Sequence, residues 1–147
     1  MLKISPLKKS DLPSIKTLFR SVFTQPPWCD DWSDDNQLTE YLLDIMSTRM
    51  PLNLGLYEND ELIGLSIGQI KHWCSGTEYF INELCIRPDH QGTGCGTAFL
   101  EGIADILRQK EVRTIFLLTE RETPAYAFYL KRGFEEVPNQ AAFFKNI

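Results

Sequence analysis

One short loop of this chain contains three glycines, Gly92, Gly94 and Gly96. Their spacing is the clearest sign of a functional site in the sequence. The loop follows a β-rich run that ends at Pro88, and it precedes a stretch of helical periodicity from Ala98 to Lys110. Glycine lets a backbone approach an anion closely, and the unpaired amides of a helix's first turn favour negative charge. The loop is therefore expected to bind a phosphate group.

Two common phosphate-binding motifs do not fit this loop. A P-loop requires Gly-Lys followed by Ser or Thr, which is absent, and a dinucleotide fingerprint that starts at Gly94 would place its third glycine at Phe99. The loop also lies in the middle of the chain, after three predicted strands, whereas a dinucleotide fingerprint usually opens its domain. Another class of phosphate-containing ligand is therefore indicated.

Two motifs resemble those of the GNAT superfamily of N-acetyltransferases. The run IRPDHQGTGCG is similar to the superfamily's acetyl-CoA motif, Gln/Arg-x-x-Gly-x-Gly/Ala, with Gln91, Gly94 and Gly96 at its defined positions. The run PAYAFYLKRGF, residues 124–134, resembles the second mark of the superfamily, which is filled here by Ala125, Phe128, Tyr129, Gly133 and Phe134. Both motifs occur in the right order, so the resemblance covers nearly the whole chain.

The resemblance implies acetyl-CoA as the cosubstrate and assigns residues to it. The loop and first helical turn would hold the pyrophosphate with Gln91, Gly92, Thr93, Gly94, Cys95, Gly96 and Thr97. The backbone of Leu84, Cys85 and Ile86 would pair with the pantetheine arm like an added strand, and the Cys85 amide would stabilise the oxyanion. Ala125 and Phe128 would contact the cofactor from the helix of the second motif.

Direct acetyl transfer needs a group that removes a proton from the amine. An amine with a lysine-like pKa of about 10.4 is almost fully protonated at neutral pH. Glu83 is the first candidate base because it precedes the phosphate loop on the strand where superfamily members often place one. Glu120 is the second candidate, and a chain of water molecules is a third possibility. The alternative role for Glu83 is an outward carboxylate paired with a neighbouring cation.

Tyr129 is expected near the CoA sulfur by resemblance. Full protonation of the thiolate by a tyrosine is uphill by about 2 kcal/mol, from pKa values of about 8.5 and about 10, so Tyr129 could act by hydrogen bonding alone. Its structural alternative is an ordinary packed tyrosine. A covalent acyl-enzyme on Cys85 is disfavoured because no His or Asp partner is placed for it.

The segment between the first two predicted helices is rich in aromatic and acidic residues. Trp28, Asp31 and Trp32, together with Glu120, are candidates for binding a cationic amine such as an amino sugar, a polyamine or a lysine side chain. The alternative is an exposed loop in which Asp34 or Asp35 only caps the next helix.

The surrounding elements alternate in a way that predicts an α/β fold with a mixed sheet. Strands are expected at residues 2–7, 52–57, 61–72, 78–87, 114–118, 134–137 and 142–145, and helices at 12–23, 36–47, 98–110 and 123–132. The strands at 78–87 and 114–118 should be parallel and splayed around acetyl-CoA, because a right-handed crossover connects them. In the third strand Ile63, Leu65 and Ile67 should share one face, and Gly64, Ser66 and Gly68 should form either a close packing surface or a cleft wall.

Composition restricts the class of protein. The 147 residues are expected to form one acetyltransferase domain, and the net charge of -5 disfavours a nucleic-acid or anionic-membrane partner. No apolar run is long enough to span a bilayer and no signal-peptide stretch is present, so a cytoplasmic location is expected. The four cysteines form no Cys-x-x-Cys pair, and they are expected as free, buried thiols. No metal site is expected, although His72, Cys74 and His90 could supply ligands if folding brought them together.

These features predict an acetyl-CoA-dependent N-acetyltransferase that transfers an acetyl group directly to a primary amine of a small molecule or peptide. One alternative is a non-catalytic acyl-CoA-binding or regulatory module, and another is an acetyltransferase that acts on protein N-termini or lysines. A homodimer is possible.

Overall fold

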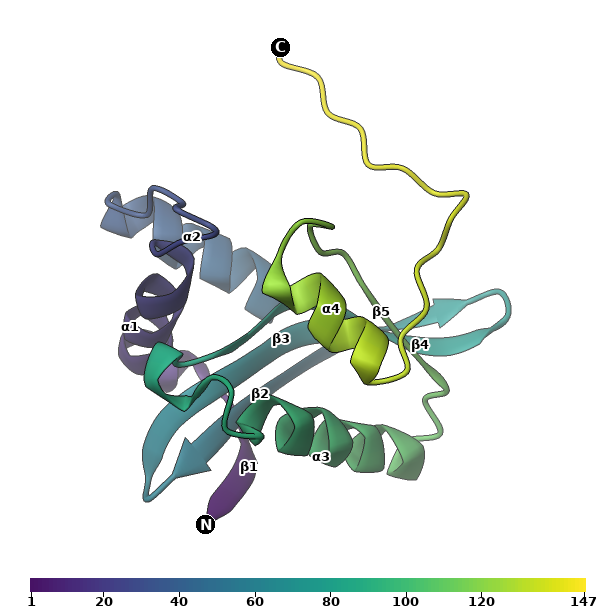
Figure 1. Cartoon of the computed structure of the whole chain (residues 1–147), viewed down its shortest axis with the longest axis horizontal. Helices are drawn as coiled ribbons and strands as arrows, with labels where there is room; N and C mark the ends of the chain where they lie inside the picture. Colours follow the sequence, from purple (N-terminus) through teal and green to yellow (C-terminus); the bar gives the residue numbers. More distant parts are fainter.

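A computed structural model describes all 147 residues and contains one five-stranded sheet (Figure 1). The strands, in spatial order, are β1 (Leu2–Pro6), β2 (Pro51–Glu58), β3 (Glu61–Trp73), β4 (Gly76–Ile86) and β5 (Thr114–Leu117). Neighbours are antiparallel except β4 and β5, which are parallel. The predicted parallel pair inside an otherwise antiparallel sheet is therefore confirmed.

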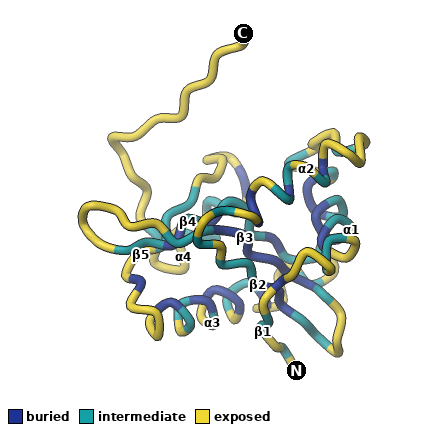
Figure 2. The backbone as a smooth tube through the Cα atoms, turned by 180° about the vertical axis from the view of Figure 1, so that it is seen from behind, coloured by how far each residue is buried: buried dark blue, intermediate teal, exposed yellow.

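Helices cover both faces of the sheet (Figures 1 and 2). Helices α1 (Leu12–Phe23) and α2 (Asp35–Met46) bury their apolar stripes on one face, and α3 (Cys95–Gln109) buries its stripe on the other. Helix α4 (Pro124–Lys131) follows β5, and two short 3-10 helices occupy Lys9–Asp11 and Pro88–His90. None of the helices combines the length and apolar character that crossing a bilayer requires.

Two β-bulges change which face of the sheet a side chain meets. Leu56 pairs with Gly64 while Tyr57 pairs with Leu62, so Ile63 is the extra residue in β3. Ile63 consequently packs in the core under α3, while Leu65 and Ile67 belong to the core under α1 and α2. The prediction that Ile63 shares a face with the next two apolar residues is wrong, because simple alternation does not include the bulge.

The small residues of β3 serve close packing. A Cβ on Gly68 would lie 2.3 Å from the Phe80 carbonyl oxygen, and one on Gly64 would lie 3.2 Å from that of Cys85. Ser66 is fully buried, and its hydroxyl is 2.9 Å from the Tyr79 hydroxyl. Of the two roles predicted for this stripe, close packing is the one that the structure shows.

The predicted closing strands at 134–137 and 142–145 are absent, and residues 135–147 extend away from the body (Figure 1). A left-handed Gly133, with φ of 89°, turns the chain after α4. Glu136 is then held by Tyr126 and Arg121, and Pro138 lacks the amide that a ladder needs. A segment with a strand-like pattern forms a strand only where it lies beside a sheet edge. This segment lies beside none in its own chain.

The cysteines are only partly as predicted. All four are free, and Cys85 and Cys95 are buried, but Cys29 and Cys74 are exposed because they lie in the loop after α1 and in the β3–β4 turn. No group of three or more His, Cys, Asp or Glu side chains is arranged to hold a metal ion.

Candidate active site

The parallel strands separate immediately after Ile81, which is the last residue of β4 that pairs with β5. The bulge at Asn82 falls at the same point, since Ile67 pairs with Glu83 and Gly68 with Ile81. Beyond the bulge, the edge of β4 that faces β5 has no strand partner. The predicted splayed pair is therefore present, and the bulge turns Glu83 toward the face that α1 and α2 cover.

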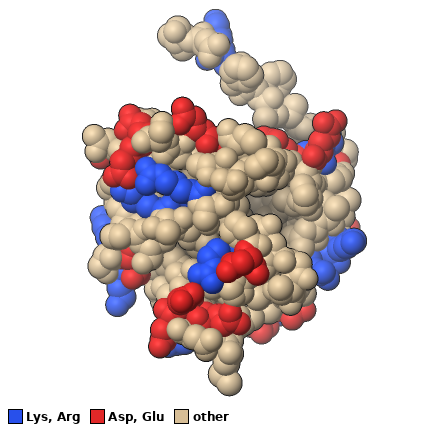
Figure 3. Space-filling model, turned by 60° about the vertical axis from the view of Figure 1, so that its left-hand side comes forward, with Lys and Arg blue, Asp and Glu red and all other residues tan.

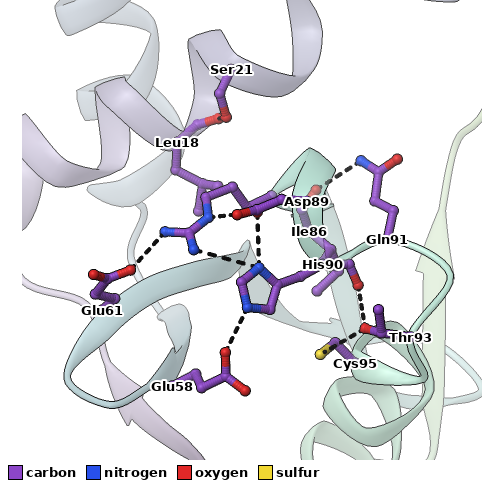
Figure 4. A network of polar contacts seen from close by, with 11 residues as sticks. Leu18, Ser21, Glu58, Glu61, Ile86, Asp89, His90, Gln91, Thr93 and Cys95 are labelled. Carbon is purple, nitrogen blue, oxygen red and sulfur yellow. Dashed lines mark hydrogen bonds and ion pairs between the residues drawn. The ribbon is translucent and has the colours of Figure 1, made fainter.

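The hydrogen-bond alternation in β4 determines which backbone groups are free. Arg87 donates its amide to Ile63 at 2.7 Å, so by alternation Cys85 also faces β3, while Leu84 and Ile86 face the gap. The Cys85 amide therefore faces β3 and is not free to donate to an oxyanion, contrary to the sequence-based expectation. The Leu84 amide is free instead. The Ile86 carbonyl accepts from the Gln91 side chain at 2.8 Å (Figure 4).

The glycine loop leads directly into α3. Gly94 is left-handed, with φ of 90°, and lies at the N-cap, where it makes no side-chain cap. The first helical hydrogen bond runs from the Ala98 amide to the Gly94 carbonyl, which leaves the amides of Cys95, Gly96 and Thr97 without a helical acceptor. No acidic side chain lies in this turn. The loop and the first turn therefore suit a phosphate group, as the sequence predicts.

Acidic and basic side chains lie next to one another on the face of the molecule drawn in Figure 3. A network of such side chains holds the loop against the β2–β3 hairpin (Figure 4). His90 lies 2.6 Å from Glu58 through Nε2 and 2.8 Å from Asp89 through Nδ1. Arg87 bridges Asp89 at 2.8 Å and Glu61 at 3.0 Å. Hydrogen bonds that the Asp89 carboxylate and then the Glu58 carboxylate accept raise the pKa of His90. The sequence offered His90 only as a possible metal ligand, and the structure gives it this bracing contact.

A cleft of about 350 Å³ opens beside the gap between β4 and β5. Its size is within the range of small-molecule sites. Its walls come from α1, the segment after it, both strand ends and α4: Phe19, Phe23, Trp28, Asp30, Trp32, residues 81–84, residues 117–120, Ala125 and Tyr129. The sequence-predicted residues Glu83, Leu84, Glu120, Ala125 and Tyr129 are thus brought together.

Glu83 is half-buried in this cleft, and its Oε1 accepts a hydrogen bond from the Tyr41 hydroxyl at 2.7 Å. The pKa of Glu83 is raised to about 6, mainly because the carboxyl is buried; the Tyr41 hydrogen bond acts against this rise, and the charge of Asp30 adds to it. A carboxyl with this pKa is mostly ionised at neutral pH and can accept a proton. No cation pairs with Glu83, so the structural alternative of an outward ion pair does not hold.

Tyr129 enters the same cleft from α4. Burial, followed by the negative charge of Glu83, raises its pKa, so the hydroxyl stays protonated and can donate a hydrogen bond. Burial likewise raises the pKa of the Cys85 thiol, which disfavours the thiolate that a covalent mechanism requires. Phe128, the preceding residue of α4, lies against Gly96, where an added Cβ would lie 3.1 Å from its ring.

The segment after α1, which carries Trp28, Asp30 and Trp32, is held against α1 by hydrogen bonds. Arg20 donates to the Trp32 carbonyl at 3.0 Å, and the Asp30 amide donates to the Phe23 carbonyl at 2.8 Å. The Trp32 ring also stacks on Tyr41, with 5.3 Å between centroids. Trp28, Asp30 and Trp32 therefore line the cleft.

Asp31, predicted as a substrate residue, does not line the cleft. Its carboxylate accepts from the Ser33 amide at 3.1 Å, and the side chain is exposed. The neighbouring Asp30 takes the predicted position. Asp34 caps α2 by accepting from the Gln37 amide at 3.1 Å, so the capping alternative holds for that residue.

Two residues of the cleft wall have buried polar atoms without a partner in the protein. These atoms are the indole Nε1 of Trp32, a donor, and Oδ1 of Asn82, an acceptor. Buried polar groups are nearly always hydrogen-bonded, so a ligand or water in the cleft is the natural partner for both.

Comparison with known proteins identifies the family. The acetyltransferase (GNAT) family matches residues 12–134. The chain belongs to the GNAT acetyltransferase family. This membership makes it an acyltransferase, and its glycine loop and α4 carry the two motifs on which the resemblance was first drawn.

Three GNAT proteins illustrate the similarity. The ribosomal protein bS18-alanine N-acetyltransferase of Haemophilus influenzae is 32% identical over 111 residues, which cover 76% of this chain and 66% of that protein. The structure of the ribosomal-protein-S18-alanine N-acetyltransferase of Escherichia coli matches with a TM-score of 0.70 and 26% identity, over 93% of this chain and 79% of that one. Aminoglycoside N-acetyltransferase AAC(6')-Iy in complex with CoA matches in fold, with a TM-score of 0.76 and 16% identity, over 99% and 95% of the two chains.

Proposed function

We propose that this acyltransferase moves an acetyl group from acetyl-CoA directly to a primary amine that binds as a cation in the cleft. The observation that carries the proposal is the position of Glu83: a half-buried carboxylate without a cation partner, in a cleft that opens beside the free edge of β4. Asp30 and Glu120 add negative charge to the cleft, and Trp28 and Trp32 add aromatic faces. A cationic amine satisfies this lining better than an anionic or apolar acceptor.

The donor fits the groups that the fold leaves free. The amides of Cys95, Gly96 and Thr97 would hold the pyrophosphate, and the free backbone groups of Leu84 and the Ile86 amide would pair with the pantetheine arm. The cleft lies beside the free edge of β4, and both Glu83 and Tyr129 line it. The thioester would therefore lie between these two side chains. These contacts support the cofactor assignment made from the sequence, with the Leu84 amide in place of that of Cys85 as the oxyanion donor.

The reaction then needs three groups. Glu83 accepts a proton from the bound ammonium, and the freed nitrogen lone pair attacks the acetyl carbon. The negative oxygen that results accepts a hydrogen bond from the Leu84 amide. The carbon–sulfur bond breaks, and the nitrogen releases its second proton to solvent as the amide forms. The departing thiolate receives a hydrogen bond from the Tyr129 hydroxyl.

A second candidate acceptor is the N-terminal amine of a protein. The relatives with the higher identities are named for acetylation of the alanine of a ribosomal protein. The cleft lining includes the exposed Leu118, Thr119 and Glu120, and an extended peptide would contact the cleft there. The amine chemistry is the same, and only the acceptor differs.

Release of CoA thiol from acetyl-CoA tests the proposal. The purified protein is assayed with an aminoglycoside, a polyamine, a peptide with a free N-terminal alanine and an N-blocked peptide with an internal lysine. Acceptor-dependent release that Glu83→Gln lowers by about 10²-fold or more supports it. Glu78→Gln, on the same strand but outside the cleft, is the matched control and should keep full activity. CoA binding without release on any acceptor would favour the non-catalytic binding module.

A further inference from the structure

The glycine loop between the Pro88–His90 3-10 helix and α3 forms few hydrogen bonds of its own. No backbone amide of residues 92–97 donates to an acceptor in the protein. A segment with free amides opens at low cost unless other contacts hold it. The Thr93 hydroxyl donates to the His90 carbonyl and lies 3.2 Å from Cys95 Sγ. The position of the loop therefore depends on where His90 is held.

Charged side chains from separate parts of the fold lie around the His90 imidazole (Figure 4). Glu58 ends β2 and Glu61 begins β3, so both belong to the β2–β3 hairpin. Arg87 follows β4 directly, and Asp89 precedes His90 on the 3-10 helix. Only 16% of the His90 side chain is exposed. The imidazole therefore lies between the start of the loop and the hairpin.

Both ring nitrogens of His90 meet carboxylate oxygens. Nε2 lies 2.6 Å from Glu58 Oε2, and Nδ1 lies 2.8 Å from Asp89 Oδ1, whereas Arg87 Nη2 is farther from Nδ1, at 3.5 Å. A neutral imidazole carries one N–H and can donate at only one of the two carboxylates. Asp89 does not supply the second proton, because hydrogen bonds from Arg87 and then His90 hold the pKa of its carboxyl at about 2. The two contacts together therefore require the imidazolium form of His90.

We propose that His90 is a positioning residue for CoA, whose imidazolium joins the glycine loop to the β2–β3 hairpin and keeps the loop amides in place for the pyrophosphate. When His90 loses its proton, one of the two contacts is lost, the loop is held more weakly, and the affinity for CoA falls. The inference rests on the proposed binding of CoA at this loop and adds a dependence on pH. The contacts with Asp89 and Glu58 raise the pKa of His90 above its ordinary value of 6.5. The bracing is therefore fully present below pH 6.5 and is lost as the pH rises through the raised pKa.

An NMR titration of the histidine side chains tests the charge of His90 without any ligand. The chain has two histidines, so a His72→Gln variant identifies the His90 signal. Its midpoint should lie above pH 6.5. Glu58→Gln keeps an oxygen that accepts from His90 but removes the charge, and it should lower the midpoint. The control Asp60→Asn removes a carboxylate from the turn of the same hairpin, at a positive φ that Asn tolerates, and should leave the midpoint unchanged. A midpoint at or below 6.5, or one that Glu58→Gln does not lower, overturns the inference.

Calorimetric titration with CoA, at pH values on both sides of the measured midpoint, tests the positioning role. His90→Gln is neutral at every pH, so it should bind CoA about fivefold more weakly than the wild type below the midpoint and equally well above it. By linkage, saturating CoA should also raise the His90 midpoint in the NMR titration. CoA binding in which the ratio of wild-type to His90→Gln affinity stays constant with pH overturns this inference and leaves the proposed cofactor site standing. Absence of CoA binding by the wild type at every pH overturns both.

Discussion

Replacing Glu83 with glutamine should make the folded protein more stable at alkaline pH. Burial raises the pKa of Glu83 from 4.5 to about 6, so the fold disfavours the carboxylate relative to the unfolded chain. The stabilising contribution of the neutral acid is fully present below pH 4.5 and is lost as the pH rises through about 6. The difference of about 1.5 pKa units corresponds to about 2 kcal/mol. Glutamine is neutral at every pH, and its oxygen can still accept from Tyr41.

Urea unfolding at pH 8 and at pH 4 measures this effect. Glu83→Gln should exceed the wild type in free energy of unfolding by up to about 2 kcal/mol at pH 8, and the difference should nearly vanish at pH 4. Glu78→Gln, on the same strand but outside the cleft, is the control and should show no such pH-dependent gain. A Glu83→Gln variant that is no more stable than the wild type at pH 8, or a gain that is equal at both pH values, would refute the reasoning.

Three further substitutions test separate parts of the site. Tyr41→Phe removes the hydrogen bond that lowers the pKa of Glu83, so the acidic limb of the kcat/KM profile should move above pH 6; an unmoved limb would show that the contact does not matter in solution. Tyr129→Phe should lower kcat about tenfold or more while CoA affinity, measured by calorimetry, stays unchanged; equal kcat would remove the tyrosine from the mechanism. Gly94→Ala strains a left-handed N-cap by about 1–2 kcal/mol and should weaken CoA binding several-fold. Gly76→Ala, at another glycine of positive φ, in the β3–β4 turn, should not weaken it.

Features that depend on neighbours in the sequence were predictable. The phosphate loop is defined by three glycines within five residues and by the helix that follows, and both were located from spacing alone. The parallel pair followed from the strand–helix–strand order, since the crossover has one handedness. The helix ends shifted by a few residues only, as at Cys95, where α3 begins three residues before the predicted start.

Features that depend on contacts between distant residues were not predictable. Tyr41 and Glu83 are 42 positions apart, and nothing near Tyr41 in the sequence distinguishes it from the other apolar positions of α2. The bulges at Ile63 and Asn82 change the facing of side chains without a local signal. Asp30 and Asp31 are equivalent in sequence, and only the Asx turn to Ser33 separates the residue in the cleft from the one outside it.

The closing strands were wrong for a related reason. An alternating pattern shows that a segment can bury one of its faces. Strand pairing also requires a sheet edge that the segment can contact. Residues 142–145 carry the pattern, and the anchor at Glu136 directs them away from their own sheet.

The pH dependence of kcat/KM, for wild type and Glu83→Gln with the amine that turns over fastest, tests the central claim most directly. The account predicts a wild-type rate that falls below a pH of about 6, as Glu83 becomes protonated. It also predicts a Glu83→Gln rate that is about 10²-fold lower and lacks this limb. A Glu83→Gln enzyme that keeps both the rate and the limb would show that another group takes the proton.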